Sequence, residues 1–240
     1  MPRLPLQRCS KGPELGCPVL ILRPEPGCSA TLAAARQAGL EAYGAPLFEI
    51  VPVKWDAPDS GSIDGILLGS VNALRHGGPQ FARYIGKSAH VVGGVTAAAA
   101  RAAGFTVSTI GTGGLQSVLD ELSGQQLTLL RLAGAEHVEL RTPQDIRLIT
   151  RIVYGSKALP LPPAIADVLG GGGVVLLHSA VAARHFAAEC DRLGIDRSGI
   201  KLATLGPRIA VAAGQGWGSV RSAHAPDDSA LLALAAELCQ

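Results

Sequence analysis

Small polar side chains follow several predicted strands, at the positions where open α/β sheets bind ligands. Ser70 and Asn72 come after one buried strand, Thr96 follows the next, and Ser179 follows a matching strand later in the chain. Their hydroxyl and amide groups, together with helix N-terminal N–H groups, can hold an anion such as a polycarboxylate. Each residue could instead simply cap the helix that comes after it, and this alternative stays open.

Arg23 lies at the end of the first predicted strand, in the segment Leu22-Arg23-Pro24. Its planar guanidinium suits a substrate carboxylate. An ordinary surface arginine is the alternative, and position alone does not decide between the two.

Motifs for nucleotides, metals and serine hydrolysis are absent from the sequence. The glycine run at 170–173 precedes a strand, which is the wrong side for a dinucleotide turn, and no P-loop pattern occurs. The six histidines lie far apart, with no carboxylate or cysteine at ligand spacing. No G-x-S-x-G elbow is present. We therefore expect neither a metal nor a cofactor.

Composition places the chain among folded, water-soluble proteins, since 48% of its 240 residues are hydrophobic and 17% are charged. A net charge of +2 argues against nucleic-acid binding. The longest apolar stretch is broken by prolines, Asp167 and glycines, so no membrane helix is expected. Residues 1–17 lack the hydrophobic centre of a signal peptide and are interpreted as a loose tail. The five scattered cysteines are interpreted as reduced thiols in a cytoplasmic protein.

Short apolar runs alternate with alanine-rich helical stretches along the whole chain, the pattern of parallel sheets with crossover helices. Two helices, at 29–38 and 96–103, begin near a Ser or Thr and end at Gly39 and Gly104. The predicted strands are residues 19–23, 63–68, 90–92, 106–110, 127–132, 174–177 and 201–205.

An internal repeat indicates two lobes. The strand and turn at 66–73 return at 175–182, an offset of about 109 positions (179 minus 70). More weakly, residues 128–131 with a following helix resemble 19–23 with its helix. This order predicts two flavodoxin-like lobes of doubly wound parallel sheet: residues 18–46 with 160–238, and an inserted lobe of 55–150. Residues 47–54 and 151–159 would join them as a two-stranded antiparallel hinge. A single doubly wound domain is the alternative.

Six segments in the right order make the chain resemble the uroporphyrinogen-III synthase family over roughly residues 19–238. They are Leu22-Arg23-Pro24-Glu25-Pro26-Gly27, Gly69-Ser70-Val71-Asn72-Ala73, Gly93-Gly94-Val95-Thr96-Ala97, Arg151-Ile152-Val153-Tyr154, Leu177-His178-Ser179 and Leu205-Gly206-Pro207. The two-lobe order agrees with the hinged fold of that family.

The resemblance implies a cofactor-independent lyase of haem and other tetrapyrrole biosynthesis. Such an enzyme expels the hydroxyl of hydroxymethylbilane and closes the ring with its last pyrrole inverted. Tyr154 matches the family tyrosine that assists the departing hydroxyl, although a strand tyrosine otherwise often only packs. After Gly206-Pro207 the family often carries a threonine, whereas this chain has Arg208, which could meet a substrate carboxylate.

The implied ligand is the polycarboxylate tetrapyrrole, held in a cleft between the lobes by Arg23, Ser70, Asn72, Thr96, Ser179 and Arg208. We expect a monomer, with transient contact to the preceding enzyme of the pathway, and no nucleic-acid or membrane partner. A catalytically degenerate paralogue that binds a small anion or acts in regulation is the alternative function, which the Arg208 departure keeps open.

Overall fold

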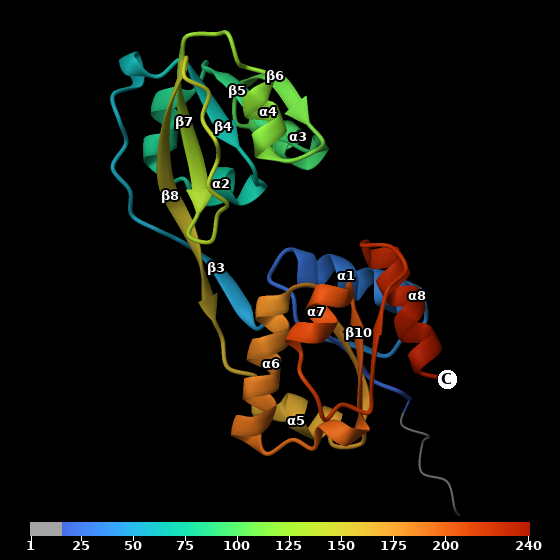
Figure 1. Cartoon of the computed structure of the whole chain (residues 1–240). Coiled ribbons are helices and arrows are strands. Elements are labelled where there is room, and N and C mark those ends of the chain that lie inside the picture. Colours follow the sequence, from blue (N-terminus) through green and yellow to red (C-terminus); the bar gives the residue numbers. More distant parts are fainter. Residues whose placement is uncertain (1–15) are drawn as a thin grey trace, which may run out of the picture. The chain divides into compact units, whose positions relative to one another are not determined.

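The computed structural model describes residues 16–240, so the expected tail at 1–17 lies almost wholly outside it. The chain divides into two compact units (Figure 1). Unit 1 holds the chain up to Phe48 together with Ala158–Gln240, and unit 2 holds Glu49–Lys157.

Unit 1 is built on a parallel sheet in the order β11-β10-β9-β1-β2. This is the strand order of flavodoxin-like sheets, because the chain first adds β2 on one side of β1 and then adds the later strands on the other. The strands are β1 (Val19–Ile21), β2 (Ala42–Gly44), β9 (Gly173–Leu177), β10 (Ile200–Thr204) and β11 (Ser219–Ser222).

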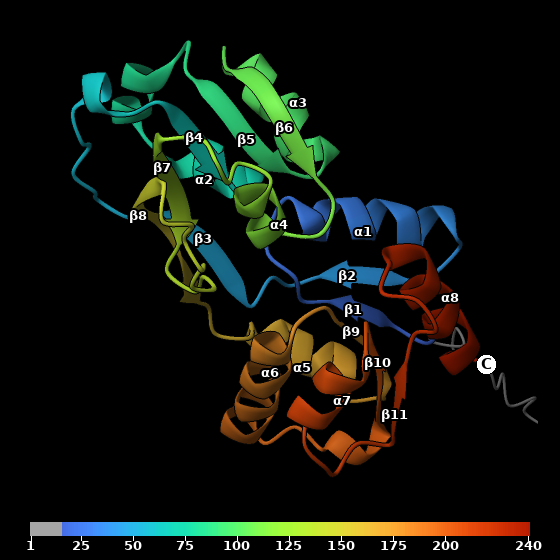
Figure 2. The ribbon, with the colours of Figure 1, turned by 45° about the horizontal axis from the view of Figure 1, so that its top comes forward.

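Helices cover both faces of this sheet (Figure 2). Alternate strand residues point to opposite faces, so Leu20 packs in one apolar cluster and Ile21 in another. The first cluster includes side chains of α5 (Pro163–Leu169), α6 (Ala180–Leu193) and α7 (Pro207–Ala212). The second includes those of α1 (Gly27–Gln37) and α8 (Asp228–Leu238).

Unit 2 has a six-stranded sheet in the order β3-β8-β7-β4-β5-β6. The five strands from β4 to β8 pair with one another in parallel. Their order differs from the expected flavodoxin type: the chain adds β5 and β6 on one side of β4, then β7 and β8 on the other, as in Rossmann-type sheets. The strands are β3 (Phe48–Pro52), β4 (Gly65–Leu68), β5 (Ser88–Val92), β6 (Thr106–Gly111), β7 (Leu127–Gly134) and β8 (Ile146–Ala158).

One face of the unit 2 sheet packs against α2 (Val71–His76), the 3₁₀ segment Pro79–Tyr84 and α3 (Gly94–Ala102), and the other against α4 (Leu115–Asp120). Short 3₁₀ turns at Ser60–Ser62 and Arg197–Gly199 precede β4 and β10. Side chains of β7 alternate between the two faces of the sheet: Leu130 belongs to the α3 cluster and Leu129 to the α4 cluster.

The helix that the sequence repeat predicts after residues 128–131 is absent, and a loop joins β7 to β8 instead. Pro143 lies in this loop, where a missing N–H and a fixed φ disfavour a helix. Side chains supply hydrogen bonds that a helix would have made with its own backbone. Gln116 accepts from the N–H of Arg141 (2.9 Å) and donates to its carbonyl (3.0 Å). The loop is thereby fixed to α4.

Strands β3 and β8 are neighbours in the sheet, and the chain passes between the units within β3 and again at the end of β8. The N–H of Val53 bonds the carbonyl of Val153 (2.9 Å), and the N–H of Leu159 bonds that of Leu47 (2.8 Å). Residue numbers thus rise along one of the paired segments while they fall along the other, which is the antiparallel pattern. A hinge role for these strands stays a prediction.

The expectation of reduced cysteines is wrong for one pair. Cys17 and Cys239 form a disulfide, with their Cα atoms 5.4 Å apart and a sequence separation of 222. The fold brings them together because Cys17 precedes β1 and Cys239 directly follows α8, whose side chains share an apolar cluster with that strand. Cys28 and Cys190 are free and buried, and Cys9 lies outside the described residues.

Candidate functional site

A cavity of about 400 Å³ lies in unit 2, at the carboxyl ends of β4, β5 and β7. The strand order reverses between β4 and β7, and such a switch point is where open α/β sheets bind ligands. The wall comprises the residues after β4, the start of α4, the end of β7, the loop that follows it and one side chain of β8. They include Gly69, Ser70, Leu115, Gln116, Arg131, Gly134, Glu136, His137 and Tyr154.

Two residues selected from sequence, Ser70 and Tyr154, line this cavity together. The register of β7 and β8 shifts between Ala133 and Gly134, so that Gly134 pairs with Tyr154. An irregularity of this kind re-aims a side chain at the end of a strand. The half-buried Tyr154 ring also contacts the α3-side apolar cluster and has the His76 ring 6.3 Å away between centroids.

Ser70 also caps α2, because its Oγ accepts a hydrogen bond from the N–H of Asn72 at 3.2 Å. The capping role is therefore real. It leaves the hydroxyl proton of Ser70 available to donate to a ligand in the cavity.

Asn72 and Thr96 are not among the residues that line the cavity. Asn72 Oδ1 accepts from Arg75 at 3.5 Å on the surface. Thr96 is only 6% exposed, within the first turns of α3.

Arg131 is the residue of this site that the sequence reasoning missed as a binding group. It lies within β7 and is 4% exposed. One of its terminal nitrogens donates to the carbonyl of Val138 at 2.8 Å, and its buried Nε has no partner among the described residues. Burial lowers the pKa of Arg131, and the charges of Glu139 and Tyr154 oppose that effect. A charged residue inside an otherwise apolar strand pattern was the available signal.

The other predicted residues belong to unit 1. Arg23 follows β1 and forms an ion pair with Asp228, its Nη1 lying 2.7 and 2.9 Å from the two carboxylate oxygens. Thr31 donates to the same carboxylate at 2.7 Å. The sequence reasoning did not identify Asp228, the first residue of α8. The Arg23 guanidinium therefore already has an anionic partner within the protein.

His178 follows β9 and belongs to the same cluster, with Nε2 3.2 Å from Asp228 Oδ1. Burial and the charge of Arg23 lower the pKa of His178, against the opposing effect of Asp228. Although burial raises the pKa of Asp228, the Thr31 hydrogen bond and the charges of Arg23 and His178 hold it below its usual value. The cluster thus combines a neutral histidine, a carboxylate and a guanidinium at the unit 1 switch point.

Ser179 and Arg208 are both exposed. Ser179 caps α6 by accepting from the N–H of Ala182 at 3.1 Å. Arg208 is the second residue of α7, after the carboxyl end of β10. Both lie at the carboxyl edge of the unit 1 sheet, as Arg23 does.

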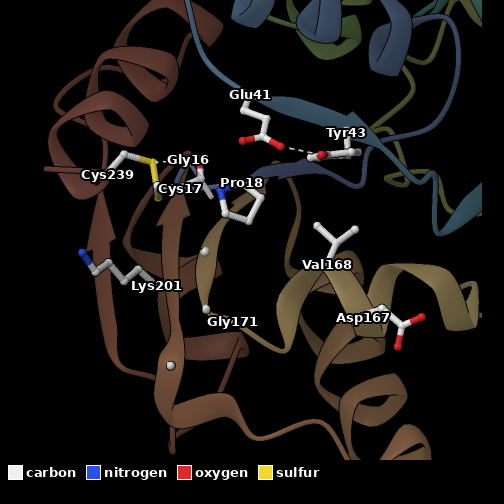
Figure 3. Close-up of a pocket in the computed structure, with 13 residues that line it drawn as sticks. Gly16, Cys17, Pro18, Glu41, Tyr43, Asp167, Val168, Gly171, Lys201 and Cys239 are labelled. Carbon is white, nitrogen blue, oxygen red and sulfur yellow. Dashed lines mark hydrogen bonds between the residues drawn. A yellow bond between two sulfur atoms is a disulfide. The ribbon is translucent and has the colours of Figure 1, made fainter. Parts of the chain in front are cut away.

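A second cavity, of about 500 Å³, lies in unit 1 at the opposite ends of the strands (Figure 3). Its wall includes residues that precede β1, β9 and β10: Pro18, Gly172 and Gly199. The glycine run at 170–173 lets these segments meet, since a Cβ on Gly173 would lie 2.8 Å from the Pro18 carbonyl oxygen. The Cys17–Cys239 disulfide lies at this cavity, away from the carboxyl edge.

Within residues 16–240, no group of three His, Cys, Asp or Glu side chains could hold a metal ion. No helix in this part of the chain is long and apolar enough to cross a membrane.

Two doubly wound α/β units, the second inserted into the first and bearing a cavity at its switch point, define a two-unit α/β protein with a candidate small-molecule site. A family model, uroporphyrinogen-III synthase HemD, matches residues 29–233. The chain belongs to the uroporphyrinogen-III synthase family, an enzyme family of tetrapyrrole biosynthesis, which confirms the resemblance seen in the sequence.

One solved structure agrees in fold. The crystal structure of a uroporphyrinogen-III synthetase from Helicobacter pylori is similar, with a TM-score of 0.64, 16% identity, and coverage of 92% of this chain and 99% of that one. A native uroporphyrinogen III synthase from Thermus thermophilus has a TM-score of 0.38 and 18% identity, covering 93% and 96% of the two chains. A search of curated proteins finds no match.

Proposed function

We propose that this chain is a lyase that converts hydroxymethylbilane into uroporphyrinogen III and water, with Tyr154 as the group that assists loss of the hydroxyl. The observation that carries the proposal is the placement of Tyr154 in the switch-point cavity of a chain that belongs to this family. A phenol is protonated near neutral pH and can donate a hydrogen bond or proton to a leaving hydroxyl.

The reaction needs no redox partner. Departure of the hydroxyl as water breaks one C–O bond and leaves an azafulvene cation on the first ring. The substituted carbon of the last ring attacks this cation to give a spiro intermediate, which fragments and recloses through the free carbon of the inverted ring. Loss of the proton from that carbon balances the proton that left with water. The protein must hold a flexible chain so that closure occurs at the hindered carbon.

The remaining features belong to the same proposal. Arg23, Ser179 and Arg208 of unit 1, and Ser70, Asn72 and Thr96 of unit 2, are proposed to contact substrate polar groups. The Arg23–Asp228 ion pair favours a role for Arg23 in positioning, since its charge is already balanced. We also propose a cytoplasmic monomer that accepts the unstable bilane from the preceding enzyme.

The test supplies freshly made hydroxymethylbilane, oxidises the products and separates the two uroporphyrin isomers by chromatography. We expect predominance of the inverted isomer and a loss of rate on the order of 10²-fold in Tyr154→Phe. Tyr43→Phe is the matched control, because the Tyr43 hydroxyl bonds Glu41 at 2.6 Å in unit 1 and does not line the unit 2 cavity. The non-inverted isomer alone, at the spontaneous rate, would refute the enzymatic function.

A further inference from the structure

Arg131 carries a buried charge that the described part of the protein does not balance. It is 4% exposed, and neither a hydrogen bond nor an ion pair joins it to a carboxylate within residues 16–240. Glu139 acts on Arg131 through its charge, but its side chain is 93% exposed. Glu136, which lines the same cavity, is exposed as well. A buried, unpaired cation is unfavourable, so we expect an anion to bind at Arg131.

The geometry of β7 fixes the side on which this anion must bind. Leu130 and Leu132 pack in the α3-side cluster, so Arg131 points to the α4 side with Leu129. Arg131 lines the 400 Å³ cavity there, together with the start of α4 and the loop that contributes Val138. Its single hydrogen bond to the Val138 carbonyl leaves other N–H groups, including Nε, able to donate.

Because Tyr154 lines the same cavity, the cation and the phenol can meet one end of one ligand. The first ring of hydroxymethylbilane bears an acetate arm on the carbon next to the one that carries the hydroxymethyl group. A planar guanidinium is the side chain best suited to hold such a carboxylate.

We propose that Arg131 binds the acetate carboxylate of the first pyrrole ring and so positions the leaving hydroxyl at Tyr154. This inference rests on the proposed function, since it takes the tetrapyrrole as the ligand. It makes Arg131 a specificity-determining residue: the protein distinguishes acetate arms from neutral substituents at this position.

Binding without turnover tests the role. Uroporphyrinogen III carries four acetate and four propionate arms, whereas coproporphyrinogen III keeps the propionates and has methyl groups in place of the acetates. We would measure the dissociation constants of both, under anaerobic conditions, for the wild-type chain, Arg131→Lys and Arg131→Met. Loss of a charge-assisted hydrogen bond corresponds to a change of roughly 10- to 100-fold in affinity.

We expect the wild-type chain to prefer uroporphyrinogen III by about that factor. Arg131→Lys should retain part of the preference, because an ammonium keeps the charge without the planar fork. Arg131→Met should reduce the preference further, to what contacts with the other three acetate arms contribute. Arg147→Met removes the same charge from an exposed position of β8 and should leave the preference intact.

An unchanged preference in either folded Arg131 variant overturns the proposal, as does an equal loss in Arg147→Met. If Arg131→Met does not fold, Arg131→Lys decides. Failure of the proposed function can be distinguished from this, because the wild-type chain would then yield only the non-inverted isomer in the isomer assay. If the wild-type chain makes the inverted isomer while the Arg131 variants keep the acetate preference, only this inference fails.

Discussion

Gly134 and Tyr154 are paired across β7 and β8, and the tyrosine ring occupies the space that a side chain on Gly134 would need. A Cβ built on Gly134 would lie 2.6 Å from one ring carbon of Tyr154 and 3.0 Å from its hydroxyl oxygen. Approaches this short do not occur between unbonded atoms, so the absence of a side chain at Gly134 fixes where the phenol can lie.

Replacement of this glycine should therefore displace the phenol. We expect Gly134→Ala to lower the rate of formation of the inverted isomer on the order of 10²-fold, about as much as loss of the hydroxyl in Tyr154→Phe. Gly155→Ala is the control, because a Cβ there would lie 3.6 Å from Val53, an ordinary contact. Wild-type activity in Gly134→Ala would show that Tyr154 is not positioned by this contact.

Two serines allow capping to be separated from ligand binding. Ser70 and Ser179 accept hydrogen bonds of 3.2 and 3.1 Å as caps of α2 and α6, but only Ser70 lines the unit 2 cavity. Each Ser→Ala change should lower the free energy of unfolding by about 1 kcal/mol. If capping is the whole role of a serine, its variant should keep the wild-type KM. A rise in KM in either variant, measured by steady-state kinetics beside denaturant unfolding, would show that this serine also contacts the substrate.

Two histidines give the stability of the chain a pH dependence. Burial lowers the pKa of both His90 and His178 in the folded chain. Between those lowered values and the ordinary value of about 6.5, the unfolded chain binds more protons than the folded one. The free energy of unfolding should therefore rise with pH through this window and fall as the solution is acidified. Protonation of Asp228 should also lower the free energy of unfolding, but only at lower pH, below the ordinary range of a carboxylic acid.

The effect is measured by denaturant unfolding between about pH 5.5 and pH 7.5, one unit either side of the ordinary histidine pKa. His178→Asn should flatten part of the slope, with His90 responsible for the rest. His224→Asn is the control for the substitution itself, because that side chain is exposed. A slope that survives both buried-histidine substitutions would contradict the assignment.

Sequence patterns predicted the strands with long buried runs and missed the elements that depend on the fold. Val174 to Leu177 could be read directly, because both of its faces are covered and every residue is apolar. The three-residue strand β2 and the partly exposed edge strand β11 carry no such pattern. The order of the unit 2 strands was not predictable, because the repeat does not say on which side of β4 the chain returns.

The residues of the candidate site likewise divide into those that the sequence identified and those that only the structure identified. Ser70 and Tyr154 were found because a turn motif or family segment surrounds them, whereas Arg131 and Asp228 were not, since neither belongs to such a segment. Their significance comes from what surrounds them in space: an unbalanced buried charge at Arg131 and a shared carboxylate at Asp228. Sequence spacing cannot supply either fact.

The Cys17–Cys239 disulfide should contribute measurably to stability, because it joins the segment before β1 to the end of α8 across almost the whole described chain. A cross-link that closes a long loop restricts the unfolded ensemble, and such bonds typically contribute about 2–4 kcal/mol. We expect a reductant to lower the free energy of unfolding of the wild-type chain by about this amount.

Cys17→Ser should match the reduced wild-type chain and show no response to reductant, whereas Cys9→Ser should respond as the wild type does. Because Cys28 and Cys190 are free thiols under both conditions, the response can be assigned to the one bond. Equal unfolding curves with and without reductant would mean that the disulfide adds no stability beyond the packing of α8 on the sheet.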